Sequence, residues 1–247
     1  MIELSGVEKR FRPSPWRKVT ALAGLDLRIG AGERVAVVGP NGAGKSTLFR
    51  VLAGFLRPDA GLARLEGLPP RRYVRAHGIG LLPDGSPLPG RQRAGDALFR
   101  LAVLDGLAGR EARRAVGAAL ERLELADRAA DRVGALSRGM RQRLGIASLL
   151  LRPRPVMLLD EPFGGLDPVW REGLRDLLDE LRGASPRPTI LLASHEIVEA
   201  ARVADRIVVL SGGRVRDDFP PGASLEETER RVLDRLRGRG AGAEAAA

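Results

Sequence analysis

The hydrophobic positions of the chain fall into short continuous runs that alternate with stretches of helical spacing. Four runs predict buried strands: RVAVVG at 34–39, VMLLD at 156–160, TILLAS at 189–194 and DRIVVL at 205–210. Continuous rather than alternating apolar runs are typical of strands that are covered on both faces of a sheet. KSTLFRVLAG at 45–54 has helical spacing and ends in a glycine. Strands that alternate with helices in this way predict an α/β fold with a largely parallel sheet.

Two parts of the chain depart from this pattern. Between about 90 and 150, Arg, Ala and Leu recur with helical spacing and no strand pattern, which predicts an inserted helical subdomain. The first 30 residues have antiparallel character, with IELSGV and LDLRI as strands and RPSPWRK at 12–18 as the loop between them. A helix is expected at about 225–236, and the low-complexity tail GRGAGAEAAA is expected to be disordered. The predicted division is a main domain over 1–222, a C-terminal helix over 223–236 and a tail over 237–247.

Composition narrows the setting in which the protein works. The chain has no cysteine, which excludes disulfides and thiol chemistry. The N-terminus has no apolar signal-peptide core, and the longest apolar stretches, such as LGIASLLL at 144–151, are too short to cross a bilayer. The net charge is +10, but the arginines are scattered and few aromatics lie among them. We interpret the basic residues as solvated faces rather than a nucleic-acid surface, and expect a protein of the cytosol or the cytosolic face of a membrane.

GPNGAGKST at 39–47 fits the pattern G-x-x-x-x-G-K-[ST], between a predicted buried strand and a predicted helix. Glycines let backbone N–H groups curl around phosphate oxygens, and a helix N-terminus favours anions. In this pattern Lys45 reaches the β- and γ-phosphates, and the Ser46 hydroxyl holds Mg²⁺. The predicted phosphate-binding residues are Gly39, Pro40, Asn41, Gly42, Ala43, Gly44, Lys45, Ser46 and Thr47.

VMLLDEP at 156–162 supplies two consecutive acids beside this loop. The apolar residues deliver Asp160 to the carboxyl edge of the sheet, where ligands bind in open α/β sheets. Asp160 can hold Mg²⁺ through its water shell, and Glu161 can orient or deprotonate an attacking water. The pair therefore indicates a site that hydrolyses its nucleotide.

With these motifs in order, the chain resembles the nucleotide-binding subunit of ATP-binding cassette (ABC) transporters from about residue 2 to 216. Three further segments carry the resemblance. LSRGMRQR at 136–143 is similar to the family signature LSGGQ, FGGLDP at 163–168 to its D-loop, and ASH at 193–195 to its switch-histidine loop. The resemblance implies an α/β fold with a P-loop NTPase core, a mostly parallel sheet, an N-terminal antiparallel β-subdomain and an inserted helical subdomain. It also implies ATP and Mg²⁺ as ligands.

The resemblance implies further site residues. Ser137 and Gly139 close on the γ-phosphate of ATP bound to a second copy, Asp167 belongs to the same nucleotide site, and His195 stabilises the developing charge. An aromatic side chain near the N-terminus stacks on adenine. Phe11 and Trp16 are both available, and we favour Phe11, because VEKRF ends where the family usually places this aromatic.

Two positions depart from the family pattern. Asp84 stands after the strand GIGLLP where the family has a glutamine; an acid there can hold Mg²⁺ or water, but it is shorter than glutamine. Arg138 replaces the first glycine of the signature pair and Met140 replaces its glutamine, while the serine and second glycine remain.

The predicted function is an ATP-hydrolysing subunit that pairs with a second copy and powers a membrane permease on a separate chain. The subunit would lie peripherally at the cytoplasmic face of the membrane. The signature variant, the acid at 84 and the short single cassette resemble export-type systems. The alternative is an ABC-type ATPase that acts on ribosomes or nucleic acid, but such proteins usually carry two cassettes or a long coiled-coil insertion. A non-hydrolysing regulatory binder is disfavoured because the catalytic motifs are complete.

Overall fold

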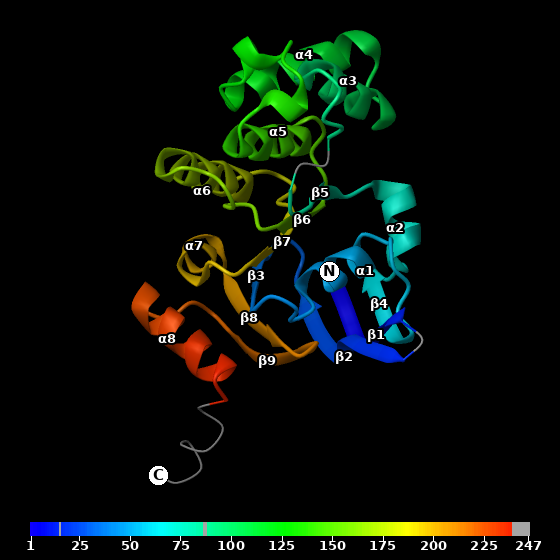
Figure 1. The fold of residues 1–247 in the computed structure, drawn as a ribbon, viewed down its shortest axis with the longest axis vertical. Helices are drawn as coiled ribbons and strands as arrows, with labels where there is room; N and C mark the ends of the chain where they lie inside the picture. The colour runs from blue at the N-terminus through cyan, green and yellow to red at the C-terminus, as the bar shows by residue number, and fades with distance from the viewer. Residues whose placement is uncertain (15, 86–87, 239–247) are drawn as a thin grey trace.

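The computed structural model describes residues 1–14, 16–85 and 88–238, and its strands form two sheets (Figure 1). The larger sheet holds, in spatial order, β5 (Gly80–Leu82), β6 (Val156–Asp160), β7 (Thr189–Ser194), β3 (Arg34–Val38), β8 (Arg206–Ser211) and β9 (Arg214–Phe219). Each neighbouring pair is parallel except β8 and β9, which are antiparallel. The prediction of a mostly parallel α/β sheet is confirmed.

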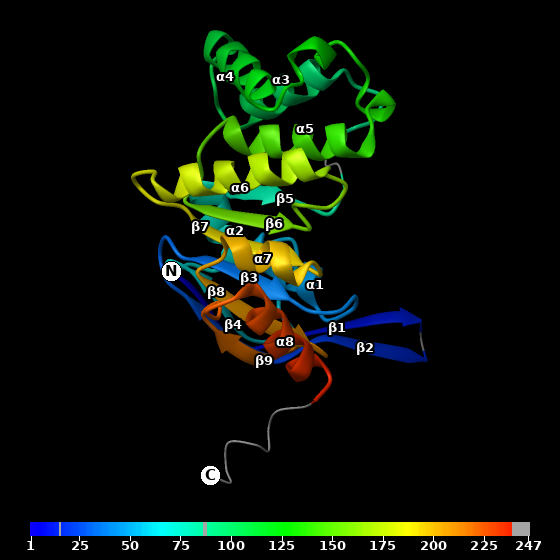
Figure 2. The same ribbon diagram turned by 90° about the vertical axis from the view of Figure 1, so that its left-hand side faces the viewer.

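The smaller, antiparallel sheet is built by the N-terminal hairpin. It holds β2 (Arg17–Ile29), β1 (Ile2–Ser14) and β4 (Ala60–Leu65) in that order. The expected loop at 12–18 is wrong, because the strands pair as far as Ser14 opposite Arg17. Proline is tolerated this far along β1 because β4 pairs with β1 only as far as Glu8, which leaves the outer edge open. The hairpin projects from the body of the molecule (Figure 2).

Alternate side chains of the parallel strands face two hydrophobic cores. Val156 and Leu158 of β6 pack in one core with α1 (Lys45–Leu52) and the antiparallel sheet. Met157 and Leu159 pack in the other core, together with residues of the helical segment at 94–150 and of the helices after β6. Both faces of the sheet are therefore covered, which explains why its strands read as continuous apolar runs.

The segment between β5 and β6 contains no strand in its described part, residues 88–155. It holds α3 (Ala94–Leu104), α4 (Gly109–Arg122) and α5 (Arg138–Leu150), which gather at one end of the molecule (Figures 1 and 2). Two short 3₁₀ turns, Ala126–Arg128 and Val133–Ala135, lead into α5. The segment occupies the range in which a helical insertion was expected.

The other helices complete the layers. They are α2 (Pro70–His77), α6 (Pro168–Arg182), α7 (Ile197–Val203) and α8 (Leu225–Leu236), of which α8 packs on α7, β8 and β9. No helix among the described residues is long and apolar enough to cross a membrane. The expected disordered tail lies, from residue 239 onward, outside the described residues.

Candidate active site

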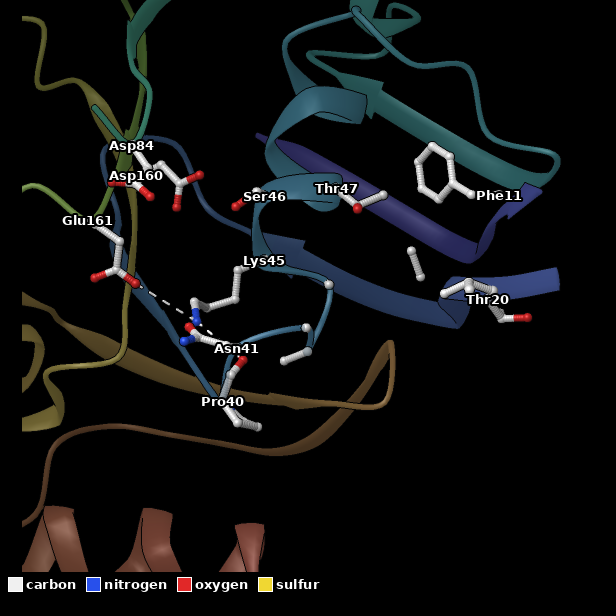
Figure 3. A pocket seen from close by; sticks show the side chains of 15 residues that line it. Phe11, Thr20, Pro40, Asn41, Lys45, Ser46, Thr47, Asp84, Asp160 and Glu161 are labelled. Carbon is white, nitrogen blue, oxygen red and sulfur yellow. Dashed lines mark hydrogen bonds and ion pairs between the residues drawn. The ribbon is translucent and has the colours of Figure 1, made fainter. Parts of the chain in front are cut away.

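A cavity of about 310 Å³ opens where the antiparallel sheet meets the carboxyl edge of the parallel sheet (Figure 3). Three parts of the chain line it: the hairpin, the loop after β3 with the start of α1, and the ends of β5 and β6. The lining residues are Phe11, Val19, Thr20, Ala21, Pro40, Asn41, Gly42, Ala43, Gly44, Lys45, Ser46, Thr47, Asp84, Asp160 and Glu161. Most of the residues that the sequence predicted for nucleotide binding therefore share one cavity.

Two positions of the loop before α1 can be occupied only by glycine. A Cβ on Gly39 would overlap the carbonyl oxygen of Leu210. Gly44 has φ +110° and a Cβ there would lie 2.5 Å from the carbonyl oxygen of Ala21. The N–H of Ala43 donates to the carbonyl of Pro40 at 3.1 Å and closes the turn. The backbone is thereby packed against neighbouring strands and presents the N-terminus of α1 to the cavity, an arrangement suited to phosphate.

The Lys45 side chain folds back along this loop (Figure 3). Its Nζ donates to the carbonyl oxygen of Gly39 at 2.7 Å and lies 3.9 Å from Oε1 of Glu161. The side chain is only 6% exposed. A cation in so enclosed a place, with carbonyl partners and one carboxylate, is available to pair with phosphate oxygens.

Asp160, Ser46 and Asp84 place oxygen atoms beside the phosphate loop. Asp160 is 6% exposed. Burial raises the pKa of its carboxyl group, with smaller upward effects of Glu161 and Asp84, while a hydrogen bond from Ser46 and the charge of Lys45 act downward. A divalent cation would relieve this crowding of carboxylates. Hydroxyl and carboxylate oxygens suit Mg²⁺, which usually takes one or two protein carboxylates and completes its shell with water and substrate phosphates.

Glu161 and His195 are brought into contact at the end of β6. Glu161 has φ +51°, and its N–H donates to the carbonyl of Ala193 at 2.8 Å. Its Oε2 lies 2.8 Å from Nδ1 of His195, and 3.3 Å from both the backbone N of His195 and Oγ of Ser194. His195 does not line the cavity itself but touches the carboxylate that does. The left-handed backbone, which a non-glycine residue adopts at a cost, aims the Glu161 side chain away from the course of the strand.

The hairpin places the two candidate aromatic side chains in different surroundings. Phe11 lines the cavity, whereas Trp16 lies at the turn with 95% of its surface exposed. Val19, opposite Phe11 in the hairpin, and its neighbours Thr20 and Ala21 complete this wall. Sequence analysis missed these three residues. The register of the hairpin, which pairs Phe11 with Val19, would have identified them, but the loop expected at 12–18 excluded this pairing.

Comparison with known proteins shows the family of the chain. The family model described as ABC transporter matches residues 22–164. The chain belongs to the ABC transporter family. It is 40% identical to the phosphonates import ATP-binding protein PhnC 2 of Pseudomonas aeruginosa, over 87% of this chain and 84% of that protein. It is also 40% identical to the daunorubicin resistance ATP-binding protein DrrA3 of Streptomyces coeruleorubidus, over 87% of this chain and 66% of that protein.

Among solved structures, the ABC transporter chain is similar to the ATP-binding cassette MJ0796 in a dimeric post-hydrolysis state bound to ADP and Pi. The TM-score is 0.82, with 25% identity over 91% of this chain and 100% of the other. The chain is thus an ATP-binding subunit of an ABC transporter and an ATPase that uses ATP and Mg²⁺. Relatives named for import and for drug resistance are equally similar, so the comparisons leave the direction of transport open.

Four of the residues predicted to bind nucleotide in the ABC transporter chain do not line the cavity. Gly39 lies at the base of the phosphate loop, whereas Ser137, Gly139 and Asp167 lie on other segments. Ser137 caps α5, with its Oγ accepting from the N–H of Met140 at 3.2 Å. Asp167 caps α6, with its Oδ1 accepting from the N–H of Trp170 at 2.9 Å. Neither contributes to the ATP cavity of its own chain.

The Arg138 side chain, which departs from the family signature, turns toward its own chain. A Cβ on Gly165 would lie 2.9 Å from Cγ and Nε of Arg138. The side chain therefore runs along the loop between β6 and α6. Its position leaves the N-terminus of α5 accessible next to the exposed Ser137.

Proposed function

We propose that the chain hydrolyses ATP between two copies of itself and so drives a separate membrane permease. One observation carries the pairing: the cavity contains the phosphate loop and both acids, while Ser137 and Gly139 stand outside it at the exposed start of α5. A head-to-tail second copy would place these residues on the γ-phosphate. The dimeric state of the similar cassette supports this arrangement.

Each part of the cavity has a role in binding. Phe11 stacks on adenine, and residues 39–47 bind the phosphates through backbone N–H groups and the Lys45 ammonium. Ser46 and Asp160 hold Mg²⁺, and Asp84 contributes an oxygen either directly or through water. When bound, Mg²⁺ supplies positive charge against the phosphate oxygens.

The catalytic residues act on the water that attacks the γ-phosphate. Glu161 orients this water and accepts its proton, and His195 stabilises the charge that develops on the phosphoryl oxygens. The partner's α5 supplies the Ser137 hydroxyl and the N–H groups of its first turn, which add hydrogen bonds to the same oxygens. Asp167 caps α6 directly after the loop that Gly139 approaches, which places its carboxylate close to the proposed interface.

The proposed direction is export, with the subunit at the cytoplasmic face of the membrane. The signature LSRGMRQR, the acid at 84 and the similarity to a daunorubicin resistance protein and a Nod factor export protein support it. Cells that lack the gene are expected to become hypersensitive to a compound the system removes. Loss of uptake of a nutrient would instead indicate import.

The assay of hydrolysis uses the Glu161→Gln variant. The purified wild-type chain, alone or with its permease, should hydrolyse ATP, and the variant should be slower by about 10²–10⁴-fold because it lacks the base. The variant should also accumulate as an ATP-dependent dimer in size-exclusion chromatography with light scattering. Glu172→Gln, the same change at an exposed position on α6, is the matched control. If wild type never hydrolyses ATP, or the variant stays monomeric with ATP, the proposal fails.

A further inference from the structure

The second turn of α5 touches the peptide that carries the catalytic acid. Gln142 is 7% exposed. Its Nε2 donates to the carbonyl oxygen of Pro162 at 2.9 Å and to that of Glu161 at 3.2 Å. A buried amide that serves two consecutive carbonyls of a neighbouring loop fixes the position of that loop.

The peptide that Gln142 holds is one that needs support. Glu161 has the left-handed φ described above, and its other backbone bonds are short-range or lead back into the sheet. Its N–H donates to Ala193 of β7, and its carbonyl accepts from the N–H of Gly164 at 3.0 Å. The carbonyl of Pro162 accepts from Gln142. Without this amide, the turn from β6 into the loop could rotate and carry the Glu161 carboxylate with it.

The first turn of α5 lies on the same loop. A Cβ on Gly139 would be 2.9 Å from the carbonyl oxygen of Gly165, which shows how closely the two backbones approach. Ser137 caps this turn. Because a helix advances only 1.5 Å per residue, Ser137 and Gln142 are about 8 Å apart along a rigid rod. A displacement of the tip of α5 therefore reaches Glu161.

We infer that Gln142 is a positioning residue for Glu161 of its own chain, and that α5 links the two ATP sites of a dimer. The inference rests on the proposed head-to-tail pairing. In such a pair, the tip of α5 senses the partner's ATP, while Gln142 of the same helix sets the catalytic acid at the chain's own ATP. Closure on one nucleotide would thus align the base at the other.

The first test separates positioning from binding. Gln142→Met keeps the length of the side chain and removes the N–H donors, and Gln142→Glu puts an acceptor against two carbonyls. We expect kcat to fall by about 10²-fold in both, as for a misplaced catalytic group, with KM for ATP changed by less than about twofold. Ser148→Ala on the same helix, which removes only a local hydrogen bond to Gly145, is the matched control and should keep wild-type kcat.

The second test shows at which of the two ATP sites Gln142→Met reduces hydrolysis. The comparison between its two arms remains informative even if the substitution weakens the fold. A test chain that keeps Glu161 is mixed with an excess of a partner chain that carries Glu161→Gln. In most dimers that contain the test chain, Glu161 of the test chain is then the only intact base. The reference is a wild-type chain with this partner. In the first arm the chain carries Gln142→Met. In the second arm the chain is wild type and its partner carries both Glu161→Gln and Gln142→Met.

The inference predicts that hydrolysis is lost in the first arm and matches the reference in the second. A residue that only supports α5 as a lid for the partner's ATP would give the reverse, with loss in the second arm. The inference would be overturned by loss in the second arm or by equal loss in both arms. A rise in KM for ATP without a fall in kcat would also overturn it. In each of these cases the proposed function would still stand. Absence of hydrolysis by wild type itself would overturn both.

Discussion

Replacing Phe11 with alanine tests whether the hairpin binds the base of ATP. The ring lines the same cavity as the phosphate loop and the start of α1 (Figure 3). Trp16 does not line this cavity and has almost its whole surface in solvent. Stacking of one base on an aromatic side chain contributes about 1–3 kcal/mol. At about 1.4 kcal/mol per tenfold, Phe11→Ala should weaken ATP binding by about 5- to 150-fold.

The assay must separate stacking from damage to the hairpin. The dissociation constants of ATP and of inorganic tripolyphosphate are measured by calorimetry for wild type, Phe11→Ala, Phe11→Tyr and Trp16→Ala. Tripolyphosphate uses the phosphate loop but has no base, so its affinity should stay within about twofold of wild type in Phe11→Ala. Phe11→Tyr keeps a π face and should keep ATP affinity. Trp16→Ala, at an exposed turn, should change stability and binding by less than about 0.5 kcal/mol.

Two results would refute the reasoning. Equal losses for ATP and tripolyphosphate in Phe11→Ala would show that the ring supports the phosphate loop rather than the base. A loss of ATP affinity in Trp16→Ala that exceeds the loss in Phe11→Ala would place the base at the turn. In that case the hairpin would have to bend toward the cavity when ATP binds.

Three further predictions concern other elements. Ser137→Arg should abolish ATP hydrolysis in the phosphate-release assay because it fills the tip of α5, whereas Arg138→Gly should keep most of it; normal hydrolysis by Ser137→Arg would contradict the proposed pairing. Gly39→Ala should lower the free energy of unfolding, measured by urea denaturation, by about 3 kcal/mol, because its Cβ would overlap the carbonyl of Leu210. Gly42→Ala should lower it by only about 1–2 kcal/mol, because Gly42 has φ +79° but open space around it. Equal losses in the two variants would contradict this reasoning. Burial acts to raise the pKa of Asp217, but hydrogen bonds from two arginines of α8 outweigh it and leave that pKa lowered; the stability that wild type has over Asp217→Asn should therefore be full above about pH 4 and vanish as pH falls further, as measured by thermal melts across pH.

The local motifs were predictable from sequence because their geometry is local. Residues 39–47 need a strand before them, a helix after them and glycines in between, and all three features are contiguous. The two acids at 160–161 follow a continuous apolar run, so their place at the sheet edge follows from the run itself. The order of these motifs was enough to indicate the family, since each additional segment restricts the possible topologies.

The rest of the cavity depends on register and on distant contacts. Prolines at 13 and 15 and the charges around them indicate a loop, yet the ladder continues because one edge of β1 is free. The wall at 19–21 therefore escaped prediction. Gln142 lies within LSRGMRQR, but nothing in the spacing of this motif shows that its amide contacts the peptide after Glu161. Contacts between segments that are separated in sequence carry no local pattern to detect.

One departure from the family signature, the arginine at 138, can be explained by the contacts of its side chain. Arg138 lies along Gly165 of its own chain, and Gly165, with φ +77°, has no side chain to oppose it. The Arg138 guanidinium is thereby kept beside the loop rather than above the tip of α5. Ser137, by contrast, caps the helix and is exposed. A long side chain fits on this side of α5 because the loop residue opposite is a glycine. The long side chain at 138 therefore leaves free the tip of α5, which the proposed pairing would place against the partner's phosphate.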